Sequence, residues 1–457
     1  MSSSSSFYHF RQRIFGYSGG GGARKVIHQK GFGCIVLLVL YSLLSCEFLL
    51  VESFAASAMK NPNRQLPDHL LIGYVDNFDE EDKIIEAVKD GVNVLVWAFF
   101  NFNETTGEIE QPKVSQAVNL IQNKLPSSKG GGDELNTLIH LTSFGGWNGP
   151  HLPTSSYSSK DLYDAWVRFN VQSAKGVFDG FDWDLEGNDN ILAKTSVLTL
   201  DCLHHMIEMS HLAKKDGYIV GMAPPQSYLD VQSDPTTITE TMMKFEASGA
   251  PFSTKLNLPP LISPTWHPEF HYTGYNSYAP LLLLHDVIDF VSIQFYETWS
   301  RANYEINHQK IDPSTYLVQY IEDLIHRNQG YHVLFTSKDL DHFKLEDGDK
   351  GQQSSSQLVS KFLPIPVNKL VFGFANGWAL NRKDGGAIFI HPSDVRKAFE
   401  TLRQKNESLV PRGCMFWCIG TEGEREIYLA KGLNKIWNKK QQTIHHSPKD
   451  ETDLTST

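Results

Sequence analysis

Cysteine is scarce in this sequence, with only five among 457 residues, and two of the five lie before residue 58. Cys202, Cys414 and Cys418 remain, an odd number that is too small for a disulfide scaffold. Cys414 and Cys418 are four residues apart in an expected strand, which places their α-carbons about 13 Å apart and beyond the reach of a bridge. A large hydrophobic core must therefore stabilise the chain.

The sequence is also poor in positive charge, since 41 Lys and Arg residues stand against 52 Asp and Glu residues and the formal net charge is −11. Beyond residue 58 there are 36 Lys and Arg residues and 50 Asp and Glu residues, which gives a formal net charge of −14. An acidic chain without basic runs is a poor match for nucleic acid or for an anionic membrane surface. A neutral polymer is a better candidate for the partner.

Apolar runs long enough for membrane targeting are missing except at residues 32–45, which follow a segment with five Arg and Lys residues. Ala56-Ser57-Ala58 then offers a small-residue cleavage site. We expect residues 1–58 to be a signal peptide that directs the protein to the secretory lumen or out of the cell. The alternative is an uncleaved signal anchor, with the bulk of the chain on the non-cytoplasmic side of the membrane.

The rest of the sequence alternates between short apolar runs and amphipathic stretches. Eight runs rich in Val, Ile, Leu and Phe are present, at residues 70–75, 92–100, 137–142, 176–186, 218–223, 287–295, 369–375 and 413–419. Amphipathic stretches such as 79–90, 114–125, 160–175 and 196–215 lie between them, which is typical of parallel strands covered by helices. The pattern predicts an α/β fold, a (β/α)8 TIM barrel over residues 66–438, in which functional groups come from the carboxyl ends of strands.

Two segments depart from this regular alternation. Residues 229–285 form a long insertion between the fifth and sixth runs, which is either a wall of a binding cleft or a structural subdomain. His267 and His271 in this insertion lack the partners of a metal site, so we expect no metal there. Residues 439–457 are polar and are expected to be a disordered tail.

The fourth run is unusual because it is a strand with four carboxylates. Asp182, Asp184 and Glu186 share one face, while Phe181 and Trp183 share the other with Leu185. Because the apolar face is covered, the acidic face must line a cavity, and same-face neighbours are only about 7 Å apart. At least one carboxyl group should then keep its proton near neutral pH, which is the arrangement that general-acid chemistry needs.

Two other interpretations of the acidic strand are weaker. A hydrated edge strand would not carry Phe, Trp and Leu on alternate positions. A calcium loop of the EF-hand type would begin at Asp182 and would need a bidentate Glu at its twelfth position, where the sequence has Ala193. The spacing therefore excludes the calcium loop.

This strand resembles the catalytic strand of glycoside hydrolase family 18, the chitinases and their relatives, whose motif is Asp-Gly-x-Asp-x-Asp-x-Glu. Asp179, Gly180, Asp182, Asp184 and Glu186 fill all its fixed positions. The motif style is similar to that of the plant and fungal class III chitinases. The resemblance implies that Glu186 is the acid and base, that Asp184 and Asp182 share a proton and stabilise the substrate acetamide, and that Asp179 and Gly180 support the strand.

Four other strand ends extend the resemblance, which implies substrate-binding roles for their residues. The third run ends in Ser143-Phe144-Gly145-Gly146-Trp147, the fifth in Met222-Ala223-Pro224-Pro225-Gln226, the sixth in Gln294-Phe295-Tyr296-Glu297 and the eighth in Met415-Phe416-Trp417. Tyr296 is expected to bind the acetamide oxygen, and Trp417 to stack on a sugar ring. Gln294, Gly145, Gly146 and Met222 are expected to contact the substrate. Glu297 departs from the Asn that the family usually has. Trp97, Phe99 and Phe416 are expected to be core, and Trp147 is undecided between core and site.

The implied activity is cleavage of β-1,4 bonds in chitin or another N-acetylglucosamine glycan, with retention of configuration and without a cofactor or a metal. Two alternatives stay open. An endo-β-N-acetylglucosaminidase acting on N-glycans uses a similar strand, and a non-catalytic chitin-binding lectin can share the fold. The oligomeric state has no signal in the sequence.

Overall fold

The computed structural model describes residues 64–125, 138–190, 198–230, 277–336, 358–380 and 387–437, together with residues 193, 195, 340 and 343. The predicted signal segment 1–58, the tail 439–457 and all but the ends of the insertion 229–285 lie outside the described residues. Their predictions therefore stay predictions.

Eight parallel strands form a closed barrel. They are β1 (Leu70–Val75), β2 (Val94–Phe102), β4 (Ile139–Gly146), β5 (Gly180–Leu185), β6 (Ile219–Met222), β7 (Phe290–Gln294), β10 (Leu370–Ala375) and β11 (Gly413–Trp417). Neighbours pair in this order, and β1 pairs with both β2 and β11, which closes the ring. Each of the eight expected runs overlaps one of these strands, and β2 and β4 extend beyond their runs, so the predicted (β/α)8 TIM barrel is confirmed.

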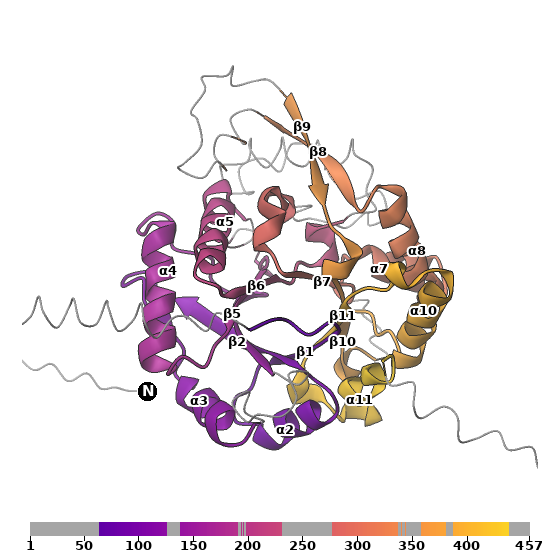
Figure 1. Cartoon of the computed structure of the whole chain (residues 1–457), viewed down its shortest axis with the longest axis horizontal. Helices are drawn as coiled ribbons and strands as arrows, with labels where there is room; N and C mark the ends of the chain where they lie inside the picture. Colours follow the sequence, from indigo (N-terminus) through magenta and orange to yellow (C-terminus); the bar gives the residue numbers. More distant parts are fainter. Residues whose placement is uncertain are drawn as a thin grey trace, which may run out of the picture. The chain divides into compact units, whose positions relative to one another are not determined.

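Helices surround the strands (Figure 1). The longer ones are α2 (Glu81–Lys89), α3 (Val114–Asn123), α4 (Ser159–Arg168), α5 (Leu200–Lys215), α8 (Pro313–His326), α10 (Pro392–Lys405) and α11 (Leu429–Asn434). Side-chain caps fix several of their starts, such as the capping box of Ser158 with Asp161 and the Thr199 hydroxyl group that accepts from the Cys202 amide.

Short helical segments complete the connections. They are α7 (Arg301–Asn303), η1 (Phe169–Ser173), η3 (Gln226–Tyr228), η5 (Ala279–Val287), η6 (Tyr304–His308), η7 (Val367–Lys369), η8 (Gly377–Ala379), η9 (Glu407–Leu409), η10 (Ile419–Thr421) and η11 (Glu424–Glu426). Within the described part of the β6–β7 connection, η3 and η5 take the place of an α-helix.

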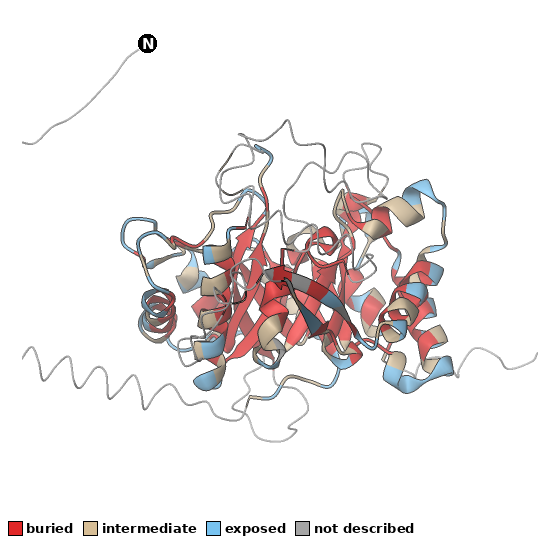
Figure 2. Cartoon of the chain, turned by 90° about the horizontal axis from the view of Figure 1, so that it is seen from above, coloured by how far each residue is buried: buried red, intermediate tan, exposed pale blue. Residues whose placement is uncertain are grey.

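The core has two layers, because strand side chains alternate between the barrel interior and the helices. Ile72, Val96 and Leu141 belong to the interior cluster, whereas Trp97 and Trp183 pack outward toward the helices. Figure 2 shows the barrel strands largely buried, whereas exposed residues lie on outer helix faces, in loops and on the β8–β9 pair outside the barrel. The large core that the scarcity of cysteine required is present, and Cys202, Cys414 and Cys418 are free thiols buried in it.

Three further strands were not predicted. β3 (Ile109–Glu110) pairs antiparallel with the end of β2. β8 (Gly330–Thr336) and β9 (Leu358–Pro364) form an antiparallel pair between α8 and β10, outside the barrel sheet. Figure 1 places this pair beyond the ring of strands.

No helix among the described residues is both long and apolar enough to cross a membrane. The same residues contain no group of three or more His, Cys, Asp or Glu side chains placed to hold a metal ion.

Candidate active site

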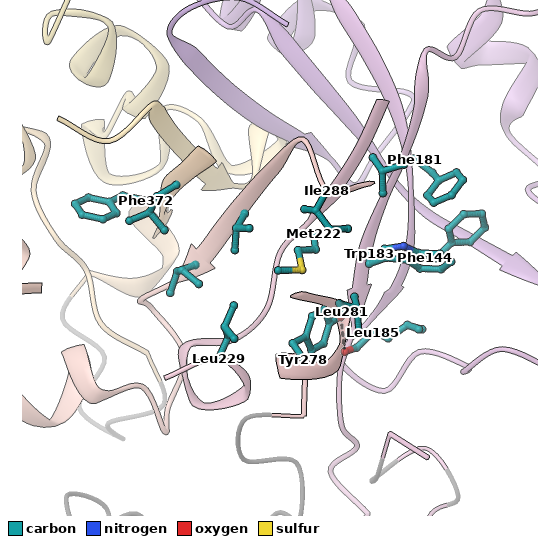
Figure 3. Packing of buried hydrophobic residues seen from close by; sticks show 14 of the residues in the cluster. Phe144, Phe181, Trp183, Leu185, Met222, Leu229, Tyr278, Leu281, Ile288 and Phe372 are labelled. Atoms are coloured by element: carbon teal, nitrogen blue, oxygen red, sulfur yellow. Dashed lines mark hydrogen bonds between the residues drawn. The ribbon is translucent and has the colours of Figure 1, made fainter. Parts of the chain in front are cut away.

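Strand β5 carries the acidic face into the barrel. It lies between β4 and β6, with Asp182 beside Ser143 and Gly221 in the parallel register. Asp182 and Asp184 are buried, and Glu186 follows the strand end and is partly exposed. Phe181 and Trp183 point away into the outer core (Figure 3). The alternation expected from the sequence therefore holds along the whole strand.

Asp182 lies deepest of the three carboxyl groups and is held by two hydroxyl groups. Tyr74 on β1 donates to Asp182 Oδ2 at 2.6 Å, and Ser143 on β4 donates to the same oxygen at 3.0 Å. Burial raises the pKa of Asp182 to about 6, although both hydrogen bonds act in the opposite direction. Asp182 Oδ1 is buried and has no hydrogen-bond partner among the described residues.

Asp184 and Glu186 form a hydrogen-bonded pair. Burial raises the pKa of Asp184, and the nearby charges of Glu186 and Asp182 raise it further. Burial also raises the pKa of Glu186. The pair therefore holds a proton near neutral pH, as the clustered carboxylates predicted, and the side-chain hydrogen bonds of Asp184 go to Glu186 and Gln294. That Asp182 and Asp184 share a proton stays a prediction.

Gln294 orients this pair from the end of β7. Its Nε2 lies 2.7 Å from Asp184 Oδ1, 3.3 Å from Glu186 Oε1 and 2.6 Å from the Ala223 carbonyl oxygen. The backbone around Glu186 is fixed as well. Tyr278 donates to the Leu185 carbonyl oxygen at 3.0 Å, and His151 Nε2 lies 2.7 Å from the Glu186 carbonyl oxygen. Glu186 is thus held on both sides of its α-carbon.

A cavity of about 490 Å³ opens over the carboxyl pair. Its described walls come from β2, β4, β5, β7 and β11, from the loops after them and from the connection after β10. They are Phe99, Gly146, Trp147, Asp184, Glu186, Asp189, Gln294, Tyr296, Glu297, Thr298, Trp299, Trp378, Ala387 and Trp417. This is the carboxyl end of the barrel, where the fold was expected to place its functional groups.

Aromatic rings form much of the wall. Phe99 and Trp417 are stacked with centroids 5.5 Å apart, and Trp147 lies 6.4 Å from Trp299. Trp378 meets Tyr296 edge-on at 6.4 Å and donates its Nε1 hydrogen to the Trp417 carbonyl oxygen. Flat apolar faces of this kind suit pyranose rings. The peptide bonds Ala98–Phe99 and Trp417–Cys418 are cis.

One loop contact fixes the cavity entrance. Trp147 Nε1 donates to Asp189 Oδ1 at 2.8 Å, and Asn148 Nδ2 donates to Asp189 Oδ2 at 2.7 Å. These two hydrogen bonds lower the pKa of Asp189. The contact joins the loops after β4 and β5 and sets the position of Trp147.

Two of the expected positions need correction. Met222 has the parity of Val220 on β6, points outward, and is buried among Tyr278, Leu229 and Ile288 (Figure 3). The prediction that Met222 contacts the substrate is wrong. Phe99, expected to be core, lines the cavity instead, whereas Trp97 and Phe416 are core as expected.

The two glycines after β4 have different surroundings. Gly146 lines the cavity, and a β-carbon there would lie 2.4 Å from the Phe99 ring. Gly145 is not among the cavity residues. It has φ +109°, and a β-carbon there would lie 2.6 Å from the Asp184 carbonyl oxygen, so it permits close approach of β4 to β5.

Asp179 and Gly180 lie at the opposite end of the strand from the cavity. Arg64 donates to Asp179 Oδ2, and the same oxygen accepts the His140 amide hydrogen at 2.9 Å. Burial raises the pKa of Asp179 to about 6, although Arg64 acts in the opposite direction. These contacts fit the predicted role of Asp179 in supporting the strand.

Gly180 has no room for a side chain, because a β-carbon would lie 1.8 Å from the Ile219 carbonyl oxygen on β6. We expect Gly180→Ala to lower the free energy of unfolding by about 3 kcal/mol, since the two strands must separate. Gly176→Ala is the control, because its surroundings are open and only its φ of +70° opposes a side chain, a cost of about 1 kcal/mol. Urea unfolding of both variants measures the difference in their free energies of unfolding. Equal losses would show that β6 does not exclude a side chain at position 180.

Some site residues had no clear signal in the sequence. Tyr74 shares the inward parity of Ile72 on β1, but nothing marked it as the partner of Asp182. Asp189 and Trp299 lie in loops and Trp378 lies in the short segment η8, and periodicity does not predict the paths of such connections. Trp147, which the sequence left undecided between core and site, lines the cavity.

No family model matches the sequence, and no curated protein matches it either. Solved structures do. The C-terminal domain of Legionella pneumophila ChiA matches with 12% identity and a TM-score of 0.46, over 81% of this chain and 99% of that one. GH18 chitinases of Flavobacterium johnsoniae (14% identity, TM-score 0.42, 81% and 94% covered) and Pseudoalteromonas aurantia (15%, 0.42, 80% and 99%) match as well. By these comparisons the chain is similar to chitinases of glycoside hydrolase family 18.

Proposed function

We propose that the protein is a retaining glycoside hydrolase that cleaves β-1,4 bonds next to N-acetylglucosamine in chitin or its oligosaccharides. The observation that carries this proposal is the hydrogen-bonded pair of Asp184 and Glu186 in a cavity walled by aromatic rings. An acid whose pKa is raised, next to a second carboxyl group, can donate a proton at neutral pH. The aromatic walls supply the binding surface for the sugar.

In the first step Glu186 gives its proton to the glycosidic oxygen as the bond from C1 to that oxygen breaks. The acetamide oxygen of the substrate forms a new bond to C1 from the opposite face, which gives a cyclic oxazolinium ion. Asp184 lies next to Glu186 and accepts a hydrogen bond from the acetamide N–H, so that its charge stabilises the positive ion. Tyr296 holds the acetamide oxygen in line with C1.

In the second step water attacks C1 from the face that the leaving group left. Glu186, now ionised, takes a proton from this water, and the bond from C1 to the acetamide oxygen breaks. The carboxyl group of Glu186 is thereby restored, and the two inversions at C1 give overall retention. Gln294 keeps hydrogen bonds to both carboxyl groups and holds their geometry through the cycle.

Chitotetraose tests the proposal directly. We expect the unmodified protein to release shorter oligosaccharides whose new reducing ends are first β-anomers, as followed by NMR. Initial α-anomers would contradict the mechanism. Binding to chitin beads without any product would indicate a lectin, and release of N-glycans without cleavage of chitotetraose would indicate an endo-β-N-acetylglucosaminidase.

A further inference from the structure

Glu297 lies in the cavity where the resemblance leads one to expect Asn. It directly follows Tyr296 after the end of β7, and both side chains line the cavity. Its backbone pairs with Ala387, another lining residue, in an isolated antiparallel bridge. The position of Glu297 is therefore fixed from two segments of the chain.

The carboxyl group of Glu297 is oriented by one residue. Ser227, in η3 after β6, donates its amide hydrogen to Glu297 Oε1 at 2.9 Å and its hydroxyl hydrogen to the same oxygen at 2.8 Å. Among the described residues, the hydrogen bonds of this carboxyl group all go to Oε1. Oε2 is left as the oxygen that can meet a ligand in the cavity.

The surroundings of Glu297 oppose a negative charge. The titratable groups that line the cavity with it are Asp184, Glu186 and Asp189 from β5 and the loop after it, and Tyr296 from the loop after β7. The described lining residues from β2, β4, η8 and β11 are glycine or aromatic residues without a charge, and none of the described lining residues is basic. Burial, together with the nearby charge of Glu186, raises the pKa of Glu297 to about 8, although the hydrogen bonds from Ser227 act in the opposite direction.

We propose that Glu297 binds the sugar as a neutral carboxylic acid, donating a hydrogen bond from Oε2 to a hydroxyl or acetamide oxygen of the ligand. This inference rests on the proposed function and names the ligand class of the same site more narrowly. A neutral carboxylic acid has one acceptor and one donor, as the amide of Asn has, so the hydrogen bonding survives the change of residue. Because the described lining also holds Asp184, Glu186 and Asp189 and no basic residue, the cavity takes uncharged amino sugars and disfavours glycans that carry a carboxylate.

Ionisation of Glu297 removes the donor and adds a negative charge beside the ligand. Binding is therefore fully present below the pKa of Glu297 and is lost as the pH rises through that pKa. Calorimetric titration with chitotetraose measures this in Glu186→Gln protein, which cannot turn the ligand over. Between pH 6 and pH 9 we expect the affinity to fall about tenfold, because a group with a pKa of about 8 is only about one tenth protonated at pH 9.

The double variant Glu186→Gln/Glu297→Gln separates the outcomes, since the amide introduced at position 297 keeps the hydrogen bonds to Ser227 and does not ionise. We expect its affinity to change less than about twofold over the same range. Asp189→Asn in the Glu186→Gln background is the matched control, because Asp189 is already ionised at pH 6 and the tenfold loss should persist. An equal loss in the double variant would overturn the inference alone, and no binding at either pH would overturn the proposed function with it.

The pH dependence of kcat/KM tests the role of the Glu297 carboxyl group in the unmodified protein. Two groups, Glu186 and Glu297, must both be protonated, so the logarithm of kcat/KM should fall with a slope near −2 at alkaline pH. In the Glu297→Gln variant the slope should be near −1, because only Glu186 still titrates. An unchanged slope of −2 would contradict the role of Glu297.

Discussion

Glu186→Gln should lower kcat on chitotetraose by about 10³-fold while KM changes little. Gln has the shape of Glu and can still accept the hydrogen bond from Gln294 Nε2, but it has no proton to give to the glycosidic oxygen. The loss therefore falls on the chemical step rather than on binding. Initial rates at pH 6, where the unmodified Glu186 is protonated, measure the effect.

The same change at an exposed position provides the control for this experiment. Glu104 lies in an exposed turn, and Glu104→Gln should leave kcat and KM within about twofold of the unmodified values. A Glu186→Gln variant with more than a tenth of the unmodified kcat would show that another group donates the proton.

Asp184→Asn should lower kcat by about 10²-fold, because the charge that stabilises the oxazolinium ion is lost. The substitution also changes the acid. An Asn side chain can donate to the Glu186 carboxylate, which favours the ionised form and lowers the pKa of Glu186. The alkaline limb of the rate profile should therefore move to lower pH, and rates between pH 5 and pH 9 measure both effects.

Urea unfolding separates this result from a folding defect. Asp184 is buried and its charge opposes its burial, so the Asn variant should be at least as stable as the unmodified protein. A large fall in kcat with an unmoved alkaline limb would mean that Asp184 does not act on Glu186. An unchanged kcat would remove Asp184 from the mechanism.

The barrel could be predicted from the sequence because its signal is strong and local. Buried parallel strands are continuous apolar runs, and all eight were visible. Strict alternation along β5 also placed Asp182 and Asp184 inside the barrel and Trp183 outside. The same rule, applied to Ile219 and Val220, would have placed Met222 outside the barrel. The prediction that Met222 contacts the substrate was wrong because it gave the family motif more weight than the alternation of strand side chains.

Phe99 could not be placed in this way. Between Trp97 and Phe100 the register with β4 shifts, because three steps along β2 face two steps along β4. This bulge reverses the alternation, so that Phe100 joins the outer core and Phe99 turns to the cavity. The apolar composition of residues 94–102 would be the same with or without a bulge. The sequence therefore gives no sign of it.

The contact between Arg64 and Asp179 shows that the stability of the barrel depends on a residue ahead of its first strand. Asp179 is almost fully buried, and the guanidinium group that neutralises it comes from a residue ahead of β1. A mature chain that starts after Ala58, as the predicted cleavage would produce, keeps this cation. Removing residues up to and including Arg64 would remove no strand, yet it would leave a buried carboxylate without its cation at the start of β5, at a cost of about 3 kcal/mol. The shortest stable fragment is therefore longer than the barrel strands and helices alone.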